Sequence, residues 1–429
     1  MYFHEVKDKR QEFVSVVVVG GGQAGLSASY YLSKSGVDHV VLERSERFHA
    51  WKKDRWDSFC LVTPNWQCRL PGWEYGGKDP NGFMPRDEIV DYLEGFAKSF
   101  NPPIREGITV QRVEGRADGK IEIESSDRLW ISSSVILATG SYDRQIKPDF
   151  ASKLDPRITQ ISSKAYKRPS DIPKGICLVV GTGQSGVQMM EDLWLADRKV
   201  SLSVGAAPRS PRIYRGRDAT DWLYEIGEYA VPIDKQPNPE ATEAKTNHYL
   251  SGRDGGHEID LREYASNGLQ LYGTVRDIEG SDIYFSPNLE ENLDRADESY
   301  LRICSMIDNY IADLKLNVPD KPTFEKLWRP PKEITHVNAF DSGITSILWC
   351  TGFVADYSWL NIDCLDSRGR PRHNRGISEA QGVYFLGLNW LHTWGSGRFL
   401  SVAEDAEHVV ENIKMKLKDS STNSLPISV

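Results

Sequence analysis

The 429-residue sequence predicts an α/β fold built on two parallel sheets. Two glycine-rich turns carry this prediction, because each directly follows a run of mostly β-branched apolar residues. The first run is 16–19, followed by Gly20, and the second is 176–180, followed by Gly181. Uninterrupted apolar runs are typical of parallel strands whose two faces are both covered by helices. A strand, a glycine-rich turn and a helix in this order indicate a dinucleotide-binding unit, so two copies predict two units.

The first turn contains Gly20, Gly22 and Gly25, with Gln23 and Ala24 between the last two glycines. In such a turn the first glycine permits a tight bend, and the second lets the backbone approach a pyrophosphate. The third glycine lets the following helix pack against the strand. The N–H groups at the start of that helix then face the anion. We therefore predict that these five residues bind a dinucleotide.

An acidic residue follows the second strand expected in this unit. That strand is 39–42, and Glu43 comes directly after it, close to the roughly 20-residue spacing expected for a carboxylate that binds a ribose hydroxyl. A carboxylate here would repel a 2′-phosphate, so the first site suits FAD or NAD rather than NADP. We assign Arg44 to the same site. A solvated charge at the end of a strand is the alternative explanation for Glu43.

The second turn is followed by basic rather than acidic residues. After a strand expected at 199–204, arginines occur at 209, 212, 215 and 217. Guanidinium groups bind phosphates bidentately and stack on aromatic rings, which favours the 2′-phosphate and adenine of NADPH over NADH. A solvated basic loop is the alternative. The residues predicted to bind this second dinucleotide are Gly181, Gly183, Gln184, Ser185, Gly186, Arg209 and Arg212.

The composition limits the classes of partner. A net charge of −9 and a pI near 5.6 argue against nucleic acid and against an anionic membrane surface. No apolar stretch is long enough for a transmembrane helix, and residues 1–12 lack the apolar core of a secretion signal. The six cysteines include no C-x-x-C pair, which favours reduced thiols and a cytoplasmic location. No metal site is predicted, and the sequence leaves a homodimer open.

The cysteine spacing also bears on the class of enzyme. Disulfide reductases carry two dinucleotide folds as well, but they need a redox-active cysteine pair near the flavin. The nearest two here, Cys60 and Cys68, are separated by an irregular stretch that contains Pro64. Two unrelated thiols explain them better, so a disulfide reductase is disfavoured.

Two further apolar strands end in small residues. One covers 134–140 and ends in Ala-Thr-Gly, and the other covers 346–352 and ends in Cys-Thr-Gly. Bulky side chains at such strand ends would collide with a bound cofactor, so we assign Thr139 and Gly140 to the first site.

The predicted architecture is two Rossmann-like, three-layer domains, one inserted into the other. The FAD-binding domain is expected at 1–165 and 335–429, and the NADP-binding domain at 174–334. Residues 169–175 have the composition of a connecting loop. Within the second domain, 215–330 is expected to be a mixed α/β insertion.

Motifs along nearly the whole chain resemble the class B flavin-containing monooxygenases, which include plant indole-pyruvate monooxygenases and bacterial relatives of unassigned substrate. The resemblance rests on the two glycine turns, the small strand ends, the loop 54–71, the helix start at 84–86 and the stretch 382–392. It implies that NADPH reduces FAD and that a flavin C4a-(hydro)peroxide transfers oxygen from O₂ to a small organic molecule. An NAD(P)H oxidase or flavin reductase of the same fold, and a non-catalytic flavoprotein, are the alternatives.

One motif of that family is not matched. Its identifying sequence is F-x-G-x-x-x-H-x-x-x-F/W, and the nearest stretch here is 160–166. We interpret Ile161 as standing at the position of the histidine and Tyr166 at the aromatic position. This departure puts in doubt what the histidine does for domain coupling and NADP handling.

The resemblance also implies residues near the flavin. Asn65 matches an asparagine beside flavin C4a and N5, and Arg69 is a candidate for contact with flavin phosphate or a peroxide oxygen. Trp51 and Trp56 are expected to line the FAD pocket, and His392 to lie on the substrate side. Each has a structural alternative: a turn asparagine, a surface ion pair, packing tryptophans and a structural histidine.

Overall fold

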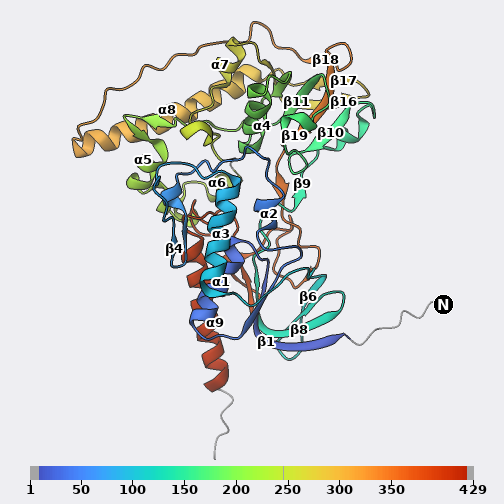
Figure 1. The fold of residues 1–429 in the computed structure, drawn as a ribbon, viewed down its shortest axis with the longest axis vertical. Coiled ribbons are helices and arrows are strands. Elements are labelled where there is room, and N and C mark those ends of the chain that lie inside the picture. Colours follow the sequence, from blue (N-terminus) through green and yellow to red (C-terminus); the bar gives the residue numbers. More distant parts are fainter. Residues whose placement is uncertain (1–8, 245, 423–429) are drawn as a thin grey trace, which may run out of the picture.

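The computed structural model describes residues 9–244 and 246–422, which form two lobes, each built around a sheet (Figure 1). The lower lobe in Figure 1 combines strands from both ends of the chain. The upper lobe is built from strands between residues 159 and 349. The mixed α/β class with parallel sheets is therefore confirmed.

The lower sheet has ten strands, and β1 (Arg10–Val19) lies between two parallel neighbours. These are β2 (His39–Leu42) and β8 (Arg128–Leu137). Residues 16–19 of β1 are buried, as an apolar run covered on both faces requires. The other strands are β5 (Ile104–Arg105), β6 (Arg112–Gly115), β7 (Ile121–Glu124), β21 (Leu360–Asn361), β22 (His373–Asn374), β23 (Ile377–Ser378) and β24 (Val383–Phe385).

Helices from both ends of the chain cover this sheet. Helix α1 (Gln23–Lys34) packs beside α9 (Val402–Thr422) and α3 (Arg86–Phe100) in the lower lobe (Figure 1). Val402, Ala406, Val409 and Val410 on one face of α9 are buried, which matches the helical face expected from the sequence. The short helix α2 (His49–Lys52) contacts α3.

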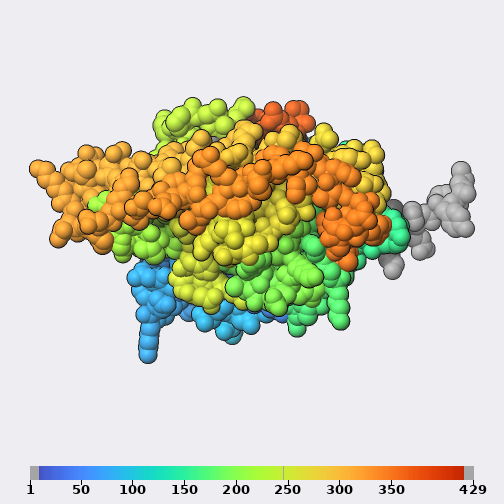
Figure 2. Space-filling model, turned by 90° about the horizontal axis from the view of Figure 1, so that it is seen from above, coloured from blue at the N-terminus to red at the C-terminus, as the bar shows by residue number. Residues whose placement is uncertain are grey.

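The upper sheet has five strands, all parallel, in the order β10–β19–β11–β12–β15. Their bounds are β10 (Thr159–Ser162), β11 (Ile176–Val180), β12 (Val200–Ser203), β15 (Gln270–Tyr272) and β19 (Ile344–Trp349). Helix α4 (Gln184–Leu195) connects β11 to β12. Helix α8 (Leu289–Leu314) is followed by the segment 316–335, which has no helix or strand and runs over the top of this lobe (Figures 1 and 2).

The remaining elements are short. They are β3 (Arg69–Leu70), β4 (Trp73–Glu74), β9 (Arg144–Gln145), β13 (Ile213–Tyr214), β14 (Arg217–Asp218), β16 (Val275–Glu279), β17 (Asp282–Phe285), β18 (His336–Asn338), β20 (Phe353–Val354), α5 (Ala219–Ile226), α6 (Pro239–Ala244) and α7 (Leu261–Ser266). No helix in the described part of the chain is long and apolar enough to span a membrane.

The boundaries predicted from the sequence need one correction. Strands β10 and β19 were expected in the first unit, but both belong to the upper sheet. The physical reason is that β19 pairs with β11, so its small-residue end must lie beside the second glycine turn rather than the first.

A buried ionic cluster in the upper lobe changes the expectation for two arginines. Arg209 is 4% exposed and pairs with Asp260 at 2.6 Å and with Asp297 at 3.0 Å. Arg212 is 1% exposed and pairs with Asp218 at 2.9 Å. Both guanidinium groups therefore pair with carboxylates inside the fold, which favours a structural role, and their role as ligands of a 2′-phosphate stays a prediction.

We expect Arg209→Met to destabilise the protein by about 3–5 kcal/mol, because it leaves Asp260 without its ion pair and Asp297 with Arg262 alone. Urea unfolding followed by circular dichroism measures the change. Arg217→Met is the matched control, since Arg217 pairs with Glu225 where both side chains are about 40% exposed and such a pair is worth about 0–1 kcal/mol. Unchanged stability of Arg209→Met together with selective loss of NADPH over NADH would restore the phosphate role.

Candidate functional site

The two glycine turns have matching geometry. A Cβ atom on Gly25 would lie 1.9 Å from the carbonyl oxygen of Gly20, and one on Gly186 would lie 1.9 Å from that of Gly181. Any side chain at either third glycine would therefore push the helix away from its strand. This contact explains the packing role predicted for the third glycine in both turns.

The first glycine of each turn contacts the end of a neighbouring strand. Gly20 has φ +115° and would place a Cβ 2.3 Å from the carbonyl oxygen of Ala138. Gly181 has φ +105° and would place one 2.7 Å from that of Cys350. Both positions combine a positive φ with close backbone contact, so only glycine fits. The small-residue strand ends thus lie beside the turns, one for each.

The second glycine of each turn faces open space. A Cβ on Gly22 would meet nothing within 4 Å, and one on Gly183 would meet only Thr246 at 3.6 Å. These glycines cap α1 and α4, and neither helix has a side-chain cap or an acidic residue in its first turn. Free N–H groups at an uncapped helix start form an anion site, so both turns fit a pyrophosphate.

Glu43 lies at the same edge of the lower sheet as the first turn. Its carboxylate accepts hydrogen bonds from the backbone N–H of Gly21 at 2.7 Å and of Ser45 at 2.9 Å. The carboxylate is thus fixed beside the turn, as ribose binding requires. Arg44 is exposed, and its guanidinium pairs with Asp143 at 2.9 Å rather than with a residue of the turn.

Trp51 and the segment 387–400 close around the first turn. The indole N–H of Trp51 donates to Gln23 Oε1 at 3.0 Å, and its ring stacks on Phe399 with centroids 5.4 Å apart. Gln23 Nε2 in turn donates to the carbonyl of Gly397 at 3.4 Å. The structure therefore brings Trp51 to the first site, together with the loop that precedes α9.

Two other candidates are placed elsewhere. Trp56 is 3% exposed and packs in the core of the upper lobe, so it does not line the first site. Asn65 is 3% exposed; its Nδ2 donates to the carbonyl of Asp79 at 3.0 Å, and its Oδ1 accepts from the N–H of Met84 at 2.7 Å. Both polar ends of Asn65 hold a loop, which supports the structural explanation over contact with a flavin.

Arg69 also has structural partners. Its Nε donates to the carbonyl of Trp66 at 3.2 Å, and its guanidinium lies over the rings of Trp66 and Tyr224, 5.1 and 5.5 Å from their centroids. Because Tyr224 belongs to α5, Arg69 joins the lower-lobe loop to the upper lobe.

His392 lies near a buried acid on α9. Burial and the nearby Arg375 and His408 lower the pKa of His392, which favours the neutral ring. Burial raises the pKa of Asp405 to about 6, against the opposing influence of Ser396 and Arg375. His392 itself belongs to the segment 387–400 that precedes α9, and its backbone N–H donates to Ser396 Oγ at 3.0 Å.

Sequence reasoning missed Asp192, which joins three segments of the chain. It is 4% exposed and accepts hydrogen bonds from Ser58 Oγ at 2.6 Å and Tyr166 OH at 2.5 Å. It also pairs with Arg253 at 2.9 Å. Ser58 belongs to the loop that follows α2 of the lower lobe, whereas Tyr166, Asp192 and Arg253 belong to the upper lobe. The sequence offers no signal for this convergence, because the four residues are far apart along the chain.

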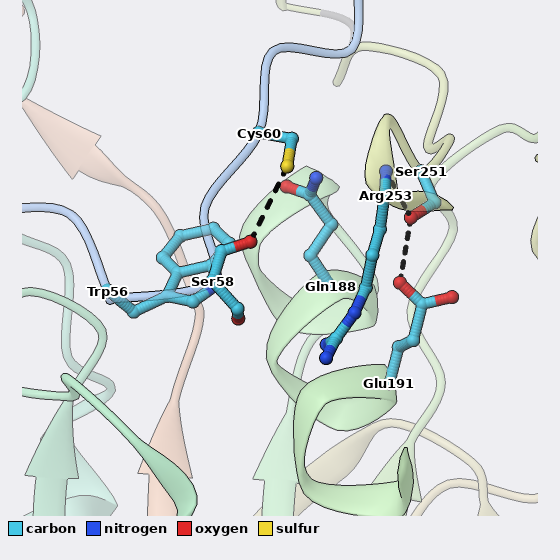
Figure 3. Close-up of a pocket in the computed structure, with 7 residues that line it drawn as sticks. All are labelled: Trp56, Ser58, Cys60, Gln188, Glu191, Ser251 and Arg253. Atoms are coloured by element: carbon cyan, nitrogen blue, oxygen red, sulfur yellow. Dashed lines mark hydrogen bonds between the residues drawn. The ribbon is translucent and has the colours of Figure 1, made fainter. Parts of the chain in front are cut away.

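This junction borders a small pocket. Its lining is Trp56, Ser58, Cys60, Gln188, Glu191, Ser251 and Arg253 (Figure 3). Glu191 accepts from Ser251 Oγ at 2.8 Å and pairs with His257 Nε2 at 2.5 Å. The hydrogen bond from Glu191 raises the pKa of His257. Most polar side chains here bond to one another, whereas the buried Oε1 of Gln188 has no partner among the described residues.

The environments of Cys60 and Cys68 do not suit disulfide chemistry. All six cysteines lie among the described residues, and all are free thiols. Burial raises the pKa of Cys60, and it raises that of Cys68 to about 12. A reactive thiol needs a lowered pKa, so neither sulfur is activated in this structure.

The placement of Tyr166 also corrects the motif alignment. In the pattern H-x-x-x-F/W the histidine stands four residues before the aromatic residue. Counting back from Tyr166 places Ser162, and not Ile161, at the histidine's position. Tyr166 is 1% exposed, and its hydroxyl is held by Asp192.

Comparisons with known proteins agree with this geometry. The family model described as pyridine nucleotide-disulphide oxidoreductase matches residues 17–218. An uncharacterized CzcO-like oxidoreductase of Geobacillus kaustophilus is 29% identical over 94% of this chain and 99% of its own length. The probable indole-3-pyruvate monooxygenase YUCCA4 of Arabidopsis thaliana is 28% identical over 41% of this chain and 43% of its own.

A solved structure shares the fold over nearly the whole chain. The flavin-containing monooxygenase from Stenotrophomonas maltophilia covers 95% of this chain and 99% of its own, with a TM-score of 0.65 and 19% identity. The resemblance predicted from the motifs is confirmed by these matches taken together with the paired glycine turns. The chain is thus similar to class B flavin-monooxygenase-like oxidoreductases, and it shares their fold over nearly its whole length.

Proposed function

We propose that the protein is an FAD-dependent NADPH monooxygenase that transfers oxygen from O₂ to a small organic molecule. The observation that carries this proposal is the pair of matched glycine turns, each ending at a helix start with free N–H groups. The chain's similarity to two proteins named as monooxygenases, the one from Arabidopsis thaliana and the one from Stenotrophomonas maltophilia, supports the proposal as well. The lower lobe would be a discontinuous FAD domain, interrupted by an NADP domain that runs from β10 to β19.

The first turn has the residues that FAD needs. Gly22 and the start of α1 would face the pyrophosphate, and Glu43 would hold the ribose. Trp51 and the segment 387–400 would close the site and exclude water. When bound, FAD would supply hydride acceptance and oxygen activation, while the chain binds and orients it.

The second turn suits a nicotinamide dinucleotide. Gly183 and the start of α4 would face its pyrophosphate, and the side chain of Gln184 is held by the backbone of Leu250. Because Arg209 and Arg212 are engaged in ion pairs, the preference for NADPH rests on the family resemblance alone. Asp192 would hold the two lobes in one orientation, so that hydride transfer between the cofactors keeps a fixed geometry.

Substitution of the second glycines tests the two sites separately. Gly22→Asp and Gly183→Asp add a negative charge where the backbone φ suits any residue and space is free, so folding should be retained. We expect Gly22→Asp to weaken FAD binding, and Gly183→Asp to weaken NADPH binding, each by roughly tenfold or more from like-charge repulsion. Equilibrium dialysis for FAD and NADP⁺ titration give the two affinities.

The matched controls are Gly22→Asn and Gly183→Asn, which add similar volume without charge. Loss of both cofactors in one variant, or equal losses for Asn and Asp, would contradict the separate assignment of the two turns.

Reduction without oxygen tests the activity itself. We expect anaerobic NADPH to bleach the visible absorbance of the bound flavin, and NADH to do so more slowly. On admission of O₂, a monooxygenase should release less H₂O₂ per NADPH when an oxidisable substrate is present. H₂O₂ release that no compound in a substrate panel lowers would support the oxidase or flavin reductase alternative, and absence of bleaching would exclude every enzyme of this class.

A further inference from the structure

Two half-buried arginines that lie close to the first turn form no ion pair with any described residue, unlike the buried Arg209 and Arg212. In the described part of the chain, neither Arg55 nor Arg398 has a carboxylate within ion-pair distance. The Nε of Arg55 is buried without a hydrogen-bond partner among those residues. Arg398 donates to the carbonyl of Trp394 and, at 2.7 Å, to Asn247 Oδ1, both uncharged acceptors. Two positive charges are therefore left uncompensated.

The two arginines converge on one aromatic residue. The guanidinium of Arg55 lies 5.9 Å from the ring centroid of Tyr142, and that of Arg398 interacts electrostatically with the same phenol. Arg55 also lies 5.1 Å from the ring of Trp51, which stacks on Phe399, the residue next to Arg398. Both charges thus lie on the same side of the first turn, and half-exposed Tyr142 opens that side to solvent.

The environment of these charges is unfavourable without an anion. Burial lowers the pKa of both guanidinium groups, against the smaller opposing influence of Tyr142 on both and of Asp54, which pairs with Lys164, on Arg55. Proteins place unpaired arginines in such surroundings where a ligand brings the negative charge, since the planar guanidinium binds an oxyanion with two hydrogen bonds.

The chemistry of the surroundings distinguishes the possible anions. The phosphates of two dinucleotides already have the free starts of α1 and α4. Around the arginines lie the rings of Trp51, Phe59, Tyr142 and Trp394, which suit the apolar body of an organic molecule. A carboxylate attached to such a body uses both features.

We propose that Arg55 and Arg398 bind the carboxylate of the substrate, so that the protein acts on organic acids with an apolar or aromatic body. This inference rests on the proposed function insofar as the bound acid is called a substrate. Binding of the acid itself requires no oxygen transfer. Asn247 accepts the hydrogen bond from Arg398, and the preceding residue, Thr246, lies next to Gly183 of the second turn. The carboxylate would therefore sit between the two cofactor sites.

Binding of paired probes to the FAD-loaded protein tests this inference. Phenylacetate carries the charge, and phenylacetamide is its neutral counterpart of similar shape. We expect the wild-type protein to bind phenylacetate roughly tenfold or more tightly than the amide, measured by calorimetry and by the flavin difference spectrum. Arg55→Gln and Arg398→Gln should each weaken phenylacetate binding by roughly tenfold and leave the amide within about threefold.

Arg157→Gln is the matched control. Arg157 also lies over an aromatic ring, 4.2 Å from the Phe340 centroid, but it is exposed and paired with Asp155. The Arg157→Gln variant should bind phenylacetate and phenylacetamide with unchanged affinity. Arg55→Lys keeps the charge without the planar fork, so it should retain part of the preference for the acid. Circular dichroism confirms that each variant is folded.

Equal wild-type affinity for the acid and the amide would overturn the inference, as would Gln variants that still prefer the acid. A tenfold loss of NADP⁺ or FAD affinity in the Gln variants would assign the arginines to a cofactor phosphate instead. A preference for the acid in a protein that NADPH cannot bleach would refute the proposed function and leave this binding site standing.

Discussion

The arrangement of both lobes depends on a contact between the third glycine of each turn and the carbonyl of the first. In each case a Cβ atom would lie 1.9 Å from that oxygen, so helix and strand can approach only because no side chain is present. The same contact aims the first N–H groups of α1 and α4 past Gly22 and Gly183 into free space. The anion sites are thus a consequence of backbone packing, and they need no charged side chain to form.

Two correctly built nucleotide sites can exchange electrons only if the lobes keep one orientation. Asp192 contributes to this constraint, because Tyr166 of the same lobe holds it in place while it accepts from Ser58 of the other lobe. A buried carboxylate with three donors is costly to expose, so rotation of one lobe against the other would leave it unsatisfied. Ser162 stands at the histidine position of the family motif, and the Ser58–Asp192 hydrogen bond offers a different way to couple the lobes.

The sequence predicted those features that a local pattern determines. Strand, glycine turn and helix follow one another along the chain, so the position of Glu43 beside Gly21 could be inferred from spacing alone. The assignment of β19 to the upper sheet could not, because sheet partners are chosen by non-local pairing. Asn65 shows the same limit, since a loop asparagine looks identical whether it holds a backbone or a ligand.

The arginines show most clearly what the sequence leaves open. Four of them follow β12 and suggested a phosphate site. In the fold, however, Arg209 pairs with Asp260 and Asp297, which are distant in sequence, and Arg212 pairs with the nearby Asp218. Arg55 and Arg398 stand alone in the sequence, and in the fold they lie close to the first turn and form no ion pair with a described residue. An arginine indicates an anion site when its guanidinium has no carboxylate partner in the folded protein. The number of arginines in a stretch of sequence does not show this. The arginines that favour a ligand site are therefore Arg55 and Arg398, between the two glycine turns, and not those of the segment 209–217 that follows the second turn.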